Sequence, residues 1–116
     1  MKIGTMKELL DAKVLCCEEN VDKNVYSACG SDLMSDVLAY VKDQAVLLTG
    51  LINPQVIRTA VMMDMICIVF VRSKTPSEEM LRLAEESGIV IMSTDKRLYE
   101  ACGLLYANGL VGNTNE

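Results

Sequence analysis

The sequence predicts an α/β fold: a single domain with a largely parallel sheet of about five strands and helices on both faces. Between residues 45 and 106, apolar strand-like runs alternate with helix signals. The later apolar runs are continuous rather than alternating, as is typical of strands covered on both faces. With 116 residues, of which 51% are hydrophobic, the chain is long enough for one packed core and too short for two ordinary domains.

The first part of the chain predicts one helix and two short strands. Thr5-Met6-Lys7-Glu8 is a capping box that opens a helix. The inward-facing residues of this helix are Met6, Leu9 and Leu10. Residues 13–17 predict a short strand, 18–23 a polar turn, and 24–29 a second strand that is mixed or at an edge.

Gly30-Ser31-Asp32 ends the second strand and caps a helix that runs to about residue 41. The apolar stripe expected for this helix consists of Leu33, Val37, Leu38 and Val41. A buried strand follows at 45–49 and ends at Gly50. Asn53-Pro54 then supplies an N-cap and a proline at the first helical position, which predicts a helix over 54–65.

The last elements continue the alternation. A β-branched run at 66–71 predicts a strand, and Thr75-Pro76-Ser77-Glu78 predicts a capped helix ending at Gly88. Residues 89–92 predict a short buried strand, and Ser93-Thr94-Asp95 caps a helix to about Tyr106. We therefore expect a domain over residues 1–109 and a C-terminal tail over 110–116.

Composition excludes several kinds of chemistry. The chain has 11 basic and 16 acidic residues, a net charge of -5, and few aromatic residues, which argues against a nucleic-acid module. It has no histidine, so histidine triads and histidine metal sites are absent. The glycines form neither GxxxxGK[ST] nor GxGxxG, the usual phosphate-binding loops. A self-sufficient hydrolase or kinase is not expected.

Five cysteines, an odd number with no CxxC pair, predict reduced and buried thiols rather than disulfides or a metal site. These residues are Cys16, Cys17, Cys29, Cys67 and Cys102. We see no secretory signal and no apolar stretch long enough to span a bilayer. We therefore expect a cytoplasmic protein without membrane contact and without a cofactor.

Small polar residues follow the predicted strands, where parallel sheets commonly bind ligands beside helix N-termini. We predict a pocket for a phosphate or carboxylate ligand, with open backbone N–H groups. The predicted ligand-binding residues are Ser31, Asp32, Ser35, Thr49, Gly50, Arg72, Ser73, Ser93 and Thr94. The alternative is that these side chains act only as helix caps.

Asp32 and Asp36 lie four residues apart on one helix face. Paired carboxylates can hold Mg²⁺ or share acid and base roles. Acidic residues in a first helical turn also stabilise the helix dipole, and this is the simpler explanation.

The order of segments resembles the DRTGG domain family, akin to the N-terminal domain of HPr kinase/phosphorylase. Val21-Asp22-Lys23-Asn24-Val25 is similar to the family's D-R-x-V turn, and the stretch from Gly30 to Val37 to its G-D-L-L-S-D-V motif. The resemblance also includes Val14-Leu15-Cys16 and the three later strands, and extends from about Thr5 to Leu105. Lys23 replaces the arginine, and Ser31 is inserted after Gly30.

This resemblance implies an HPr-kinase/Mur-ligase N-domain-like fold and a regulatory or assembly role. In the family the domain accompanies other units, such as P-loop kinase domains, CBS-domain pyrophosphatases or phosphotransacetylases. The related Mur ligase domain contacts a nucleotide sugar. Here we expect a stand-alone domain with no catalytic module attached.

Three functions remain open. The first is a non-catalytic regulatory domain that binds a small phosphorylated ligand, plausibly a nucleotide, and acts through protein contacts with a partner protein or enzyme. The second is a structural dimerisation module without a ligand. The third, ranked last, is an enzyme that uses Asp32 and Asp36 on a metal-bound phosphate. The apolar excess, with a mean hydropathy of +0.26, favours a homodimer.

Overall fold

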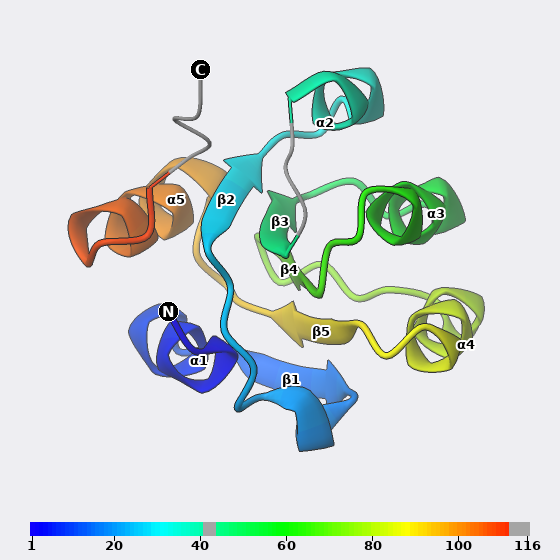
Figure 1. The fold of residues 1–116 in the computed structure, drawn as a ribbon, viewed down its shortest axis with the longest axis horizontal. Coiled ribbons are helices and arrows are strands. Elements are labelled where there is room, and N and C mark those ends of the chain that lie inside the picture. Colours follow the sequence, from blue (N-terminus) through cyan, green and yellow to red (C-terminus); the bar gives the residue numbers. More distant parts are fainter. Residues whose placement is uncertain (41–43, 112–116) are drawn as a thin grey trace.

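A five-stranded sheet with helices on both faces forms the protein, as the sequence predicts (Figure 1). The computed structural model describes residues 1–40 and 44–111. The strands are β1 (Lys13–Cys16), β2 (Ser27–Gly30), β3 (Ala45–Thr49), β4 (Cys67–Phe70) and β5 (Val90–Ser93). The helices are α1 (Ile3–Leu10), α2 (Met34–Tyr40), α3 (Pro54–Met62), α4 (Glu78–Glu86) and α5 (Leu98–Ala107). A short 3-10 helix, η1, spans Glu18–Asn20.

The strand order across the sheet is β1-β5-β4-β3-β2. Strands β2 to β5 are parallel neighbours in chain order, so each consecutive pair is joined by a crossover helix: α2, α3 or α4. Strand β1 pairs antiparallel with β5, where Lys13 lies opposite Ser93. The four parallel strands therefore end at one edge of the sheet, and the first residues of β1 lie at the same edge.

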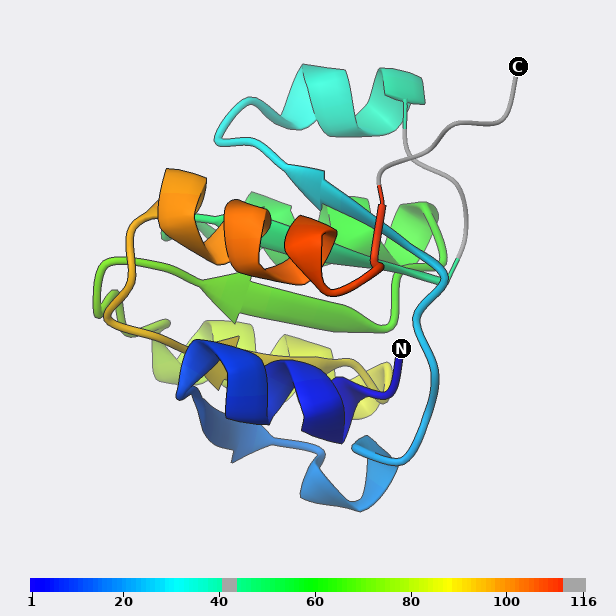
Figure 2. The same ribbon diagram turned by 90° about the vertical axis from the view of Figure 1, so that its left-hand side faces the viewer.

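Two hydrophobic layers cover the sheet. Helices α1 and α5 lie together on one face, and α2, α3 and α4 lie on the other (Figures 1 and 2). Val46 and Leu48 of β3 pack toward the first layer, whereas Leu47 packs toward the second. Every residue of β3 and β4 is buried, which confirms the double coverage that their continuous apolar sequences predict.

Helix α1 starts earlier than its capping box predicts. It begins at Ile3, and Lys2 precedes it without a side-chain cap. The N–H groups of Ile3 and Gly4 donate instead to the carbonyl oxygens of Lys23 and Val21, at 3.0 and 2.9 Å. A backbone segment distant in sequence therefore satisfies the helix N-terminus, and the Thr5 capping prediction is wrong.

Helix α2 buries less than its predicted stripe. Val37 is fully buried, but Leu33 is 58% and Leu38 42% exposed. Val41 lies outside the described residues. The helix lies at the β2 end of the sheet, with α3 as its helical neighbour, so it has too little surface beneath it to cover a wide apolar face.

The caps of the later helices are confirmed in part. Asn53 accepts a hydrogen bond from the N–H of Gln55 at the start of α3, as predicted. Helix α4 is capped by Ser77, which accepts from the N–H of Met80, so the capping box predicted to start at Thr75 is wrong. Helix α5 starts only at Leu98, after Arg97, so the predicted cap at residues 93–95 is wrong. The buried Thr94 hydroxyl is used elsewhere: it donates to the carbonyl oxygen of Leu10 at 2.7 Å.

The chain remains packed beyond α5. Leu110 is only 4% exposed and belongs to the core formed with α1 and α5. Among the helices in the described ranges, none combines the length and apolar character that crossing a bilayer requires.

We predict that Thr94→Val destabilises the fold by about 1–3 kcal/mol. Valine keeps the shape of threonine but leaves the Leu10 carbonyl without its donor, and the Lys96 N–H, which donates to the Thr94 hydroxyl at 3.3 Å, without its acceptor. Urea denaturation measures the loss. The matched control is Thr75→Val at an exposed position, where the change should stay within about 0.5 kcal/mol. Equal effects of the two substitutions would contradict this role of Thr94.

Candidate functional site

The predicted ligand-binding residues lie along the carboxyl edge of the sheet, but they do not form one cluster. Asp32, Thr49, Gly50 and Arg72 meet at the ends of β2, β3 and β4. Ser31 and Ser35 lie in the β2–α2 connection and in α2 itself. The remaining three line a cavity farther along the same edge, beside β5 and β1. They are Ser73, Ser93 and Thr94.

The first group is held together by the Asp32 carboxylate. Its Oδ1 accepts hydrogen bonds from the Thr49 hydroxyl at 2.9 Å and from the Gly50 N–H at 2.7 Å. The Thr49 Oγ1 in turn accepts from the N–H of Leu51 at 3.1 Å. Thr49 is fully buried, so this bonded set joins the β2–α2 connection to the end of β3.

Arg72 covers Gly50 from the neighbouring strand end. A Cβ atom on residue 50 would lie 2.5 Å from the Arg72 Nη2 and 3.3 Å from its Cζ, so only glycine fits under the guanidinium as it lies. Arg72 and Ser73 both have a left-handed backbone, with φ of 58° and 57°.

The backbone donors at these strand ends are largely engaged, contrary to the open N–H groups expected from the sequence. The N–H of Ser31 donates to the carbonyl of Leu48, that of Arg72 to Lys96, and that of Ser73 to Thr94. The N–H groups of Ser31, Arg72 and Ser73 are therefore not free to bind a ligand. That the nine predicted residues contact a ligand stays a prediction.

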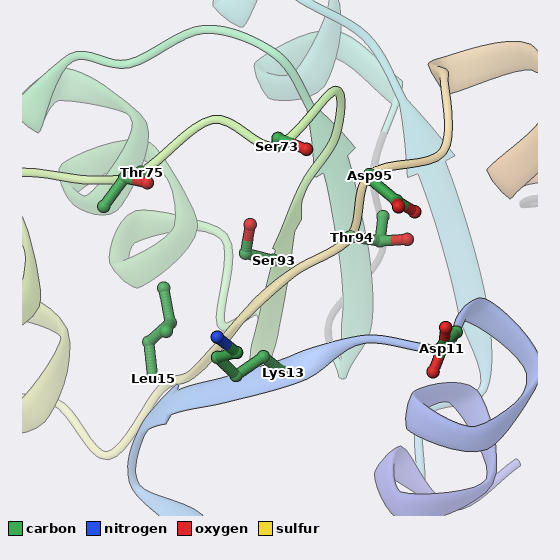
Figure 3. A pocket seen from close by; sticks show the side chains of 8 residues that line it. All are labelled: Asp11, Lys13, Leu15, Ser73, Thr75, Ser93, Thr94 and Asp95. Carbon is green, nitrogen blue, oxygen red and sulfur yellow. The ribbon is translucent and has the colours of Figure 1, made fainter.

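A cavity of about 460 Å³ opens at the β1, β4 and β5 end of this edge (Figure 3). Its size falls in the range of about 300–1,000 Å³ that is typical of small-molecule sites. Its lining comes from the start of β1, the β4–α4 connection, and the end of β5 with the residues that follow it. The lining residues are Asp11, Lys13, Leu15, Ser73, Thr75, Ser93, Thr94 and Asp95.

The lining hydroxyls differ in how far they are already bonded. Ser93 donates to the Lys74 carbonyl at 3.0 Å, and Thr94 is bonded to Leu10. Within residues 1–40 and 44–111, the Lys13 ammonium and the hydroxyls of Ser73 and Thr75 have no hydrogen-bond or ion-pair partner, and all three residues are exposed. These three side-chain groups therefore have hydrogen-bond donors that are not used within the described fold.

Five cavity residues are missing from the predicted set. They are Asp11, Lys13, Leu15, Thr75 and Asp95. Lys13 and Leu15 reach the cavity because β1 pairs antiparallel with β5, a pairing that local sequence patterns do not specify. Asp95 directly follows the predicted site residue Thr94, and Thr75 lies two residues after Ser73, so their positions in the sequence were the available signal.

All five cysteines are free thiols, as predicted, but only Cys17 and Cys67 are buried, whereas the other three are partly exposed. Burial, with the adjacent Cys17, raises the pKa of the Cys16 thiol to about 12. Burial also raises the pKa of Cys67, which is fully buried. These thiols keep their protons near neutral pH, which makes them poor nucleophiles and metal ligands.

The two acidic residues of α2 and its approach have different environments. Asp32 accepts the two hydrogen bonds described above, whereas Asp36 is exposed in the first turn of α2. Among the residues that the structure describes, no three Cys, Asp or Glu side chains are grouped closely enough to hold a metal ion.

The family model of the DRTGG domain matches residues 5–107, nearly the whole chain. The chain belongs to the DRTGG domain family. A DRTGG-containing structure has the same fold: the CBS and DRTGG domains of the regulatory region of Clostridium perfringens pyrophosphatase, complexed with the activator diadenosine tetraphosphate. The TM-score is 0.74 at 15% sequence identity. A comparison with curated protein sequences finds no match.

The similarity to the pyrophosphatase region covers 90% of this chain but only 45% of that one, so this chain spans less than half its length. Two DRTGG motifs have identifiable roles in the fold. The D-R-x-V-like turn supplies the Lys23 and Val21 carbonyls that cap α1, a backbone role that does not depend on the arginine. The inserted Ser31 accepts from the N–H of Leu33 through its hydroxyl at 3.0 Å, forming the turn before α2.

We predict that Asp32→Ala destabilises this DRTGG domain by about 1–3 kcal/mol, because it leaves the Thr49 hydroxyl and the Gly50 N–H without their acceptor. Asp36→Ala is the matched control and should change the unfolding free energy by less than about 0.5 kcal/mol. Chemical denaturation of both variants measures the difference. A metal-binding pair would instead show equal, Mg²⁺-dependent effects, and that outcome would contradict the structural role.

Proposed function

We propose that this DRTGG domain is a non-catalytic regulatory domain that binds a small phosphorylated ligand in the carboxyl-edge cavity. The observation that carries the proposal is the set of free donors in that cavity: the Lys13 ammonium and the Ser73 and Thr75 hydroxyls. A lysine with neighbouring hydroxyls suits a phosphate, which is a charged acceptor with several oxygens.

The similarity to the pyrophosphatase regulatory region supports the ligand class. That region was solved with diadenosine tetraphosphate, an activator, so a protein with this domain responds to a phosphorylated nucleotide. A nucleotide is therefore the first ligand to test on this chain.

We propose a non-catalytic domain because the groups that could react are already hydrogen-bonded or remain protonated. The Asp32 carboxylate is already bonded within the fold, and burial raises the pKa of the Cys16 thiol. The third function considered above, phosphate chemistry on Asp32 and Asp36, would need Asp32 to give up its bonds to Thr49 and Gly50. We therefore favour a domain that acts by changing its contacts with other proteins.

We further propose that the domain forms a homodimer through the β2 edge of the sheet. The two edges differ in their protection against pairing. The β1 edge starts with Lys13 and has a register irregularity between Val14 and Cys16, whereas β2 is uncharged and pairs regularly with β3 on one side only.

Exposed apolar side chains surround this β2 edge. Tyr26 precedes β2 and Leu33 follows it, with exposed fractions of 67% and 58%. Helix α5 lies beside β2, with Leu98 and Cys102 next to Gly30, and it exposes Tyr99 and Tyr106 at 93% and 64%. Aromatic residues are enriched at protein interfaces, so the edge and its surroundings suit a second copy.

The same edge favours the alternative function, a structural dimerisation module without a ligand. The two functions differ in one observable property. A regulatory domain is stabilised by a phosphorylated compound, whereas a purely structural domain is indifferent to all of them.

We predict that a phosphorylated compound stabilises the domain in a thermal unfolding panel of AMP, ATP, diadenosine tetraphosphate and acetyl phosphate. At a ligand concentration of about a hundred times the dissociation constant, the free energy of unfolding should rise by roughly 2.7 kcal/mol.

Lys13→Gln should weaken binding about tenfold or more, because it removes a charge-assisted contact. The control is Lys23→Gln, an exposed lysine at the opposite end of α1, which should bind as the wild type does.

A flat panel for the wild-type protein would contradict the ligand-binding proposal and favour the structural module. Stabilisation that Lys13→Gln leaves unchanged would place the ligand outside this cavity.

We also predict a dimer, twice the 12.8 kDa of the chain, in light scattering after size-exclusion chromatography. Tyr99→Glu should convert it to a monomer without unfolding it, since the side chain is almost fully exposed. The control is Met62→Glu on α3, which is 67% exposed and lies on the other face of the sheet. A wild-type monomer would contradict the dimer, and a monomer produced by Met62→Glu instead would move the interface to α3.

A further inference from the structure

The charges of the carboxyl-edge cavity do not match a simple anion. Its lining contains one lysine, Lys13, and two aspartates, Asp11 and Asp95. A site for phosphate alone would gain nothing from two carboxylates, which accept hydrogen bonds but cannot donate them and repel an anion. The two aspartates therefore contact a different part of the ligand or have a different role.

The positive and negative groups lie on different sides of the cavity. Lys13 is the cross-strand partner of Ser93, and Leu15, two residues along β1, packs with the α3 and α4 core. Asp11 directly follows α1, which lies on the opposite face of the sheet. The Thr94 hydroxyl is bonded to the end of that helix, at the carbonyl oxygen of Leu10. Figure 3 shows the same division, with Lys13, Leu15 and Thr75 on one side of Ser93, and Asp11 and Asp95 on the other.

The backbone holds the carboxylate side in a fixed position. Asp11 is the C-cap of α1, in a left-handed conformation with φ of 49°, and its N–H donates to the Glu8 carbonyl. Asp95 follows Thr94, whose hydroxyl bonds to Leu10 and to the N–H of Lys96. Both carboxylates are exposed on a backbone that internal hydrogen bonds fix, which lowers the cost of ordering them around a ligand.

We propose that the cavity binds a sugar phosphate or nucleoside phosphate that lies across the rim of the sheet. The phosphate contacts Lys13, Ser73 and Thr75, and the hydroxyls of the sugar donate to Asp11 and Asp95. This inference rests on the proposed function and adds the second half of the ligand. A vicinal diol matches two carboxylates because it presents two donors, and the bonds are charge-assisted.

The test compares AMP with 2′,3′-dideoxy-AMP by isothermal titration of the full chain in the presence of EDTA, which removes divalent cations. The wild-type protein should bind AMP about tenfold or more tightly, because the dideoxy compound leaves both carboxylates without donors. Inorganic phosphate should bind more weakly than either nucleotide.

Two variants assign the ends of the ligand. Asp95→Ala should reduce the preference for AMP and leave the affinity for dideoxy-AMP unchanged or raised, whereas Lys13→Gln should weaken both nucleotides to a similar extent. Asp11→Asn tests the second carboxylate, since asparagine also adopts left-handed backbone. Asp36→Asn, outside the cavity, is the control and should change neither affinity.

The outcomes separate this inference from the proposed function. Equal binding of AMP and dideoxy-AMP that depends on Lys13 would overturn the sugar contact and leave phosphate binding standing. A preference for AMP that survives Asp95→Ala and Asp11→Asn would overturn the assignment of the carboxylates. Failure of every phosphorylated compound to bind would overturn both proposals together.

Discussion

Helices cover both faces of the central strands, and the position of every polar group at the carboxyl edge depends on this double burial. All residues of β3 and β4 are buried, so neither strand can shift its register without moving apolar side chains away from one of the two cores. Parallel pairing then brings the ends of β2 to β5 to one edge. The loops that leave this edge therefore begin at fixed positions beside one another.

The polar groups at this edge have two different uses. At the β2 and β3 ends, the Asp32 carboxylate accepts hydrogen bonds from Thr49 and Gly50, so this group stabilises the fold. At the β1 and β5 ends, Lys13 and Ser73 face a cavity without internal partners among the described residues. A division of this kind suits the proposed regulatory role, in which one end of the edge keeps its shape while the other binds the ligand.

The sequence predicted the parts of this arrangement that local patterns specify. The continuous apolar strands and the Asn53 cap follow from neighbouring residues, and the structure confirms them. The start of α1 and the role of Thr94 depend on contacts with segments far along the chain, and both local predictions failed. The candidate site divides in the same way: Ser73, Ser93 and Thr94 follow strands and were predicted, whereas Lys13 reaches the cavity only through the pairing of β1 with β5.

We propose that a phosphorylated ligand occupies the cavity between β1, β4 and β5. A titration with AMP followed by two-dimensional amide NMR of the isotope-labelled chain tests it most directly, because it locates binding without any substitution. We expect saturable shifts concentrated in residues 11–15, 73–75 and 93–96, with the amides of α3 unmoved. Saturable shifts concentrated at α3 and α4, or no shifts at any AMP concentration, would contradict it.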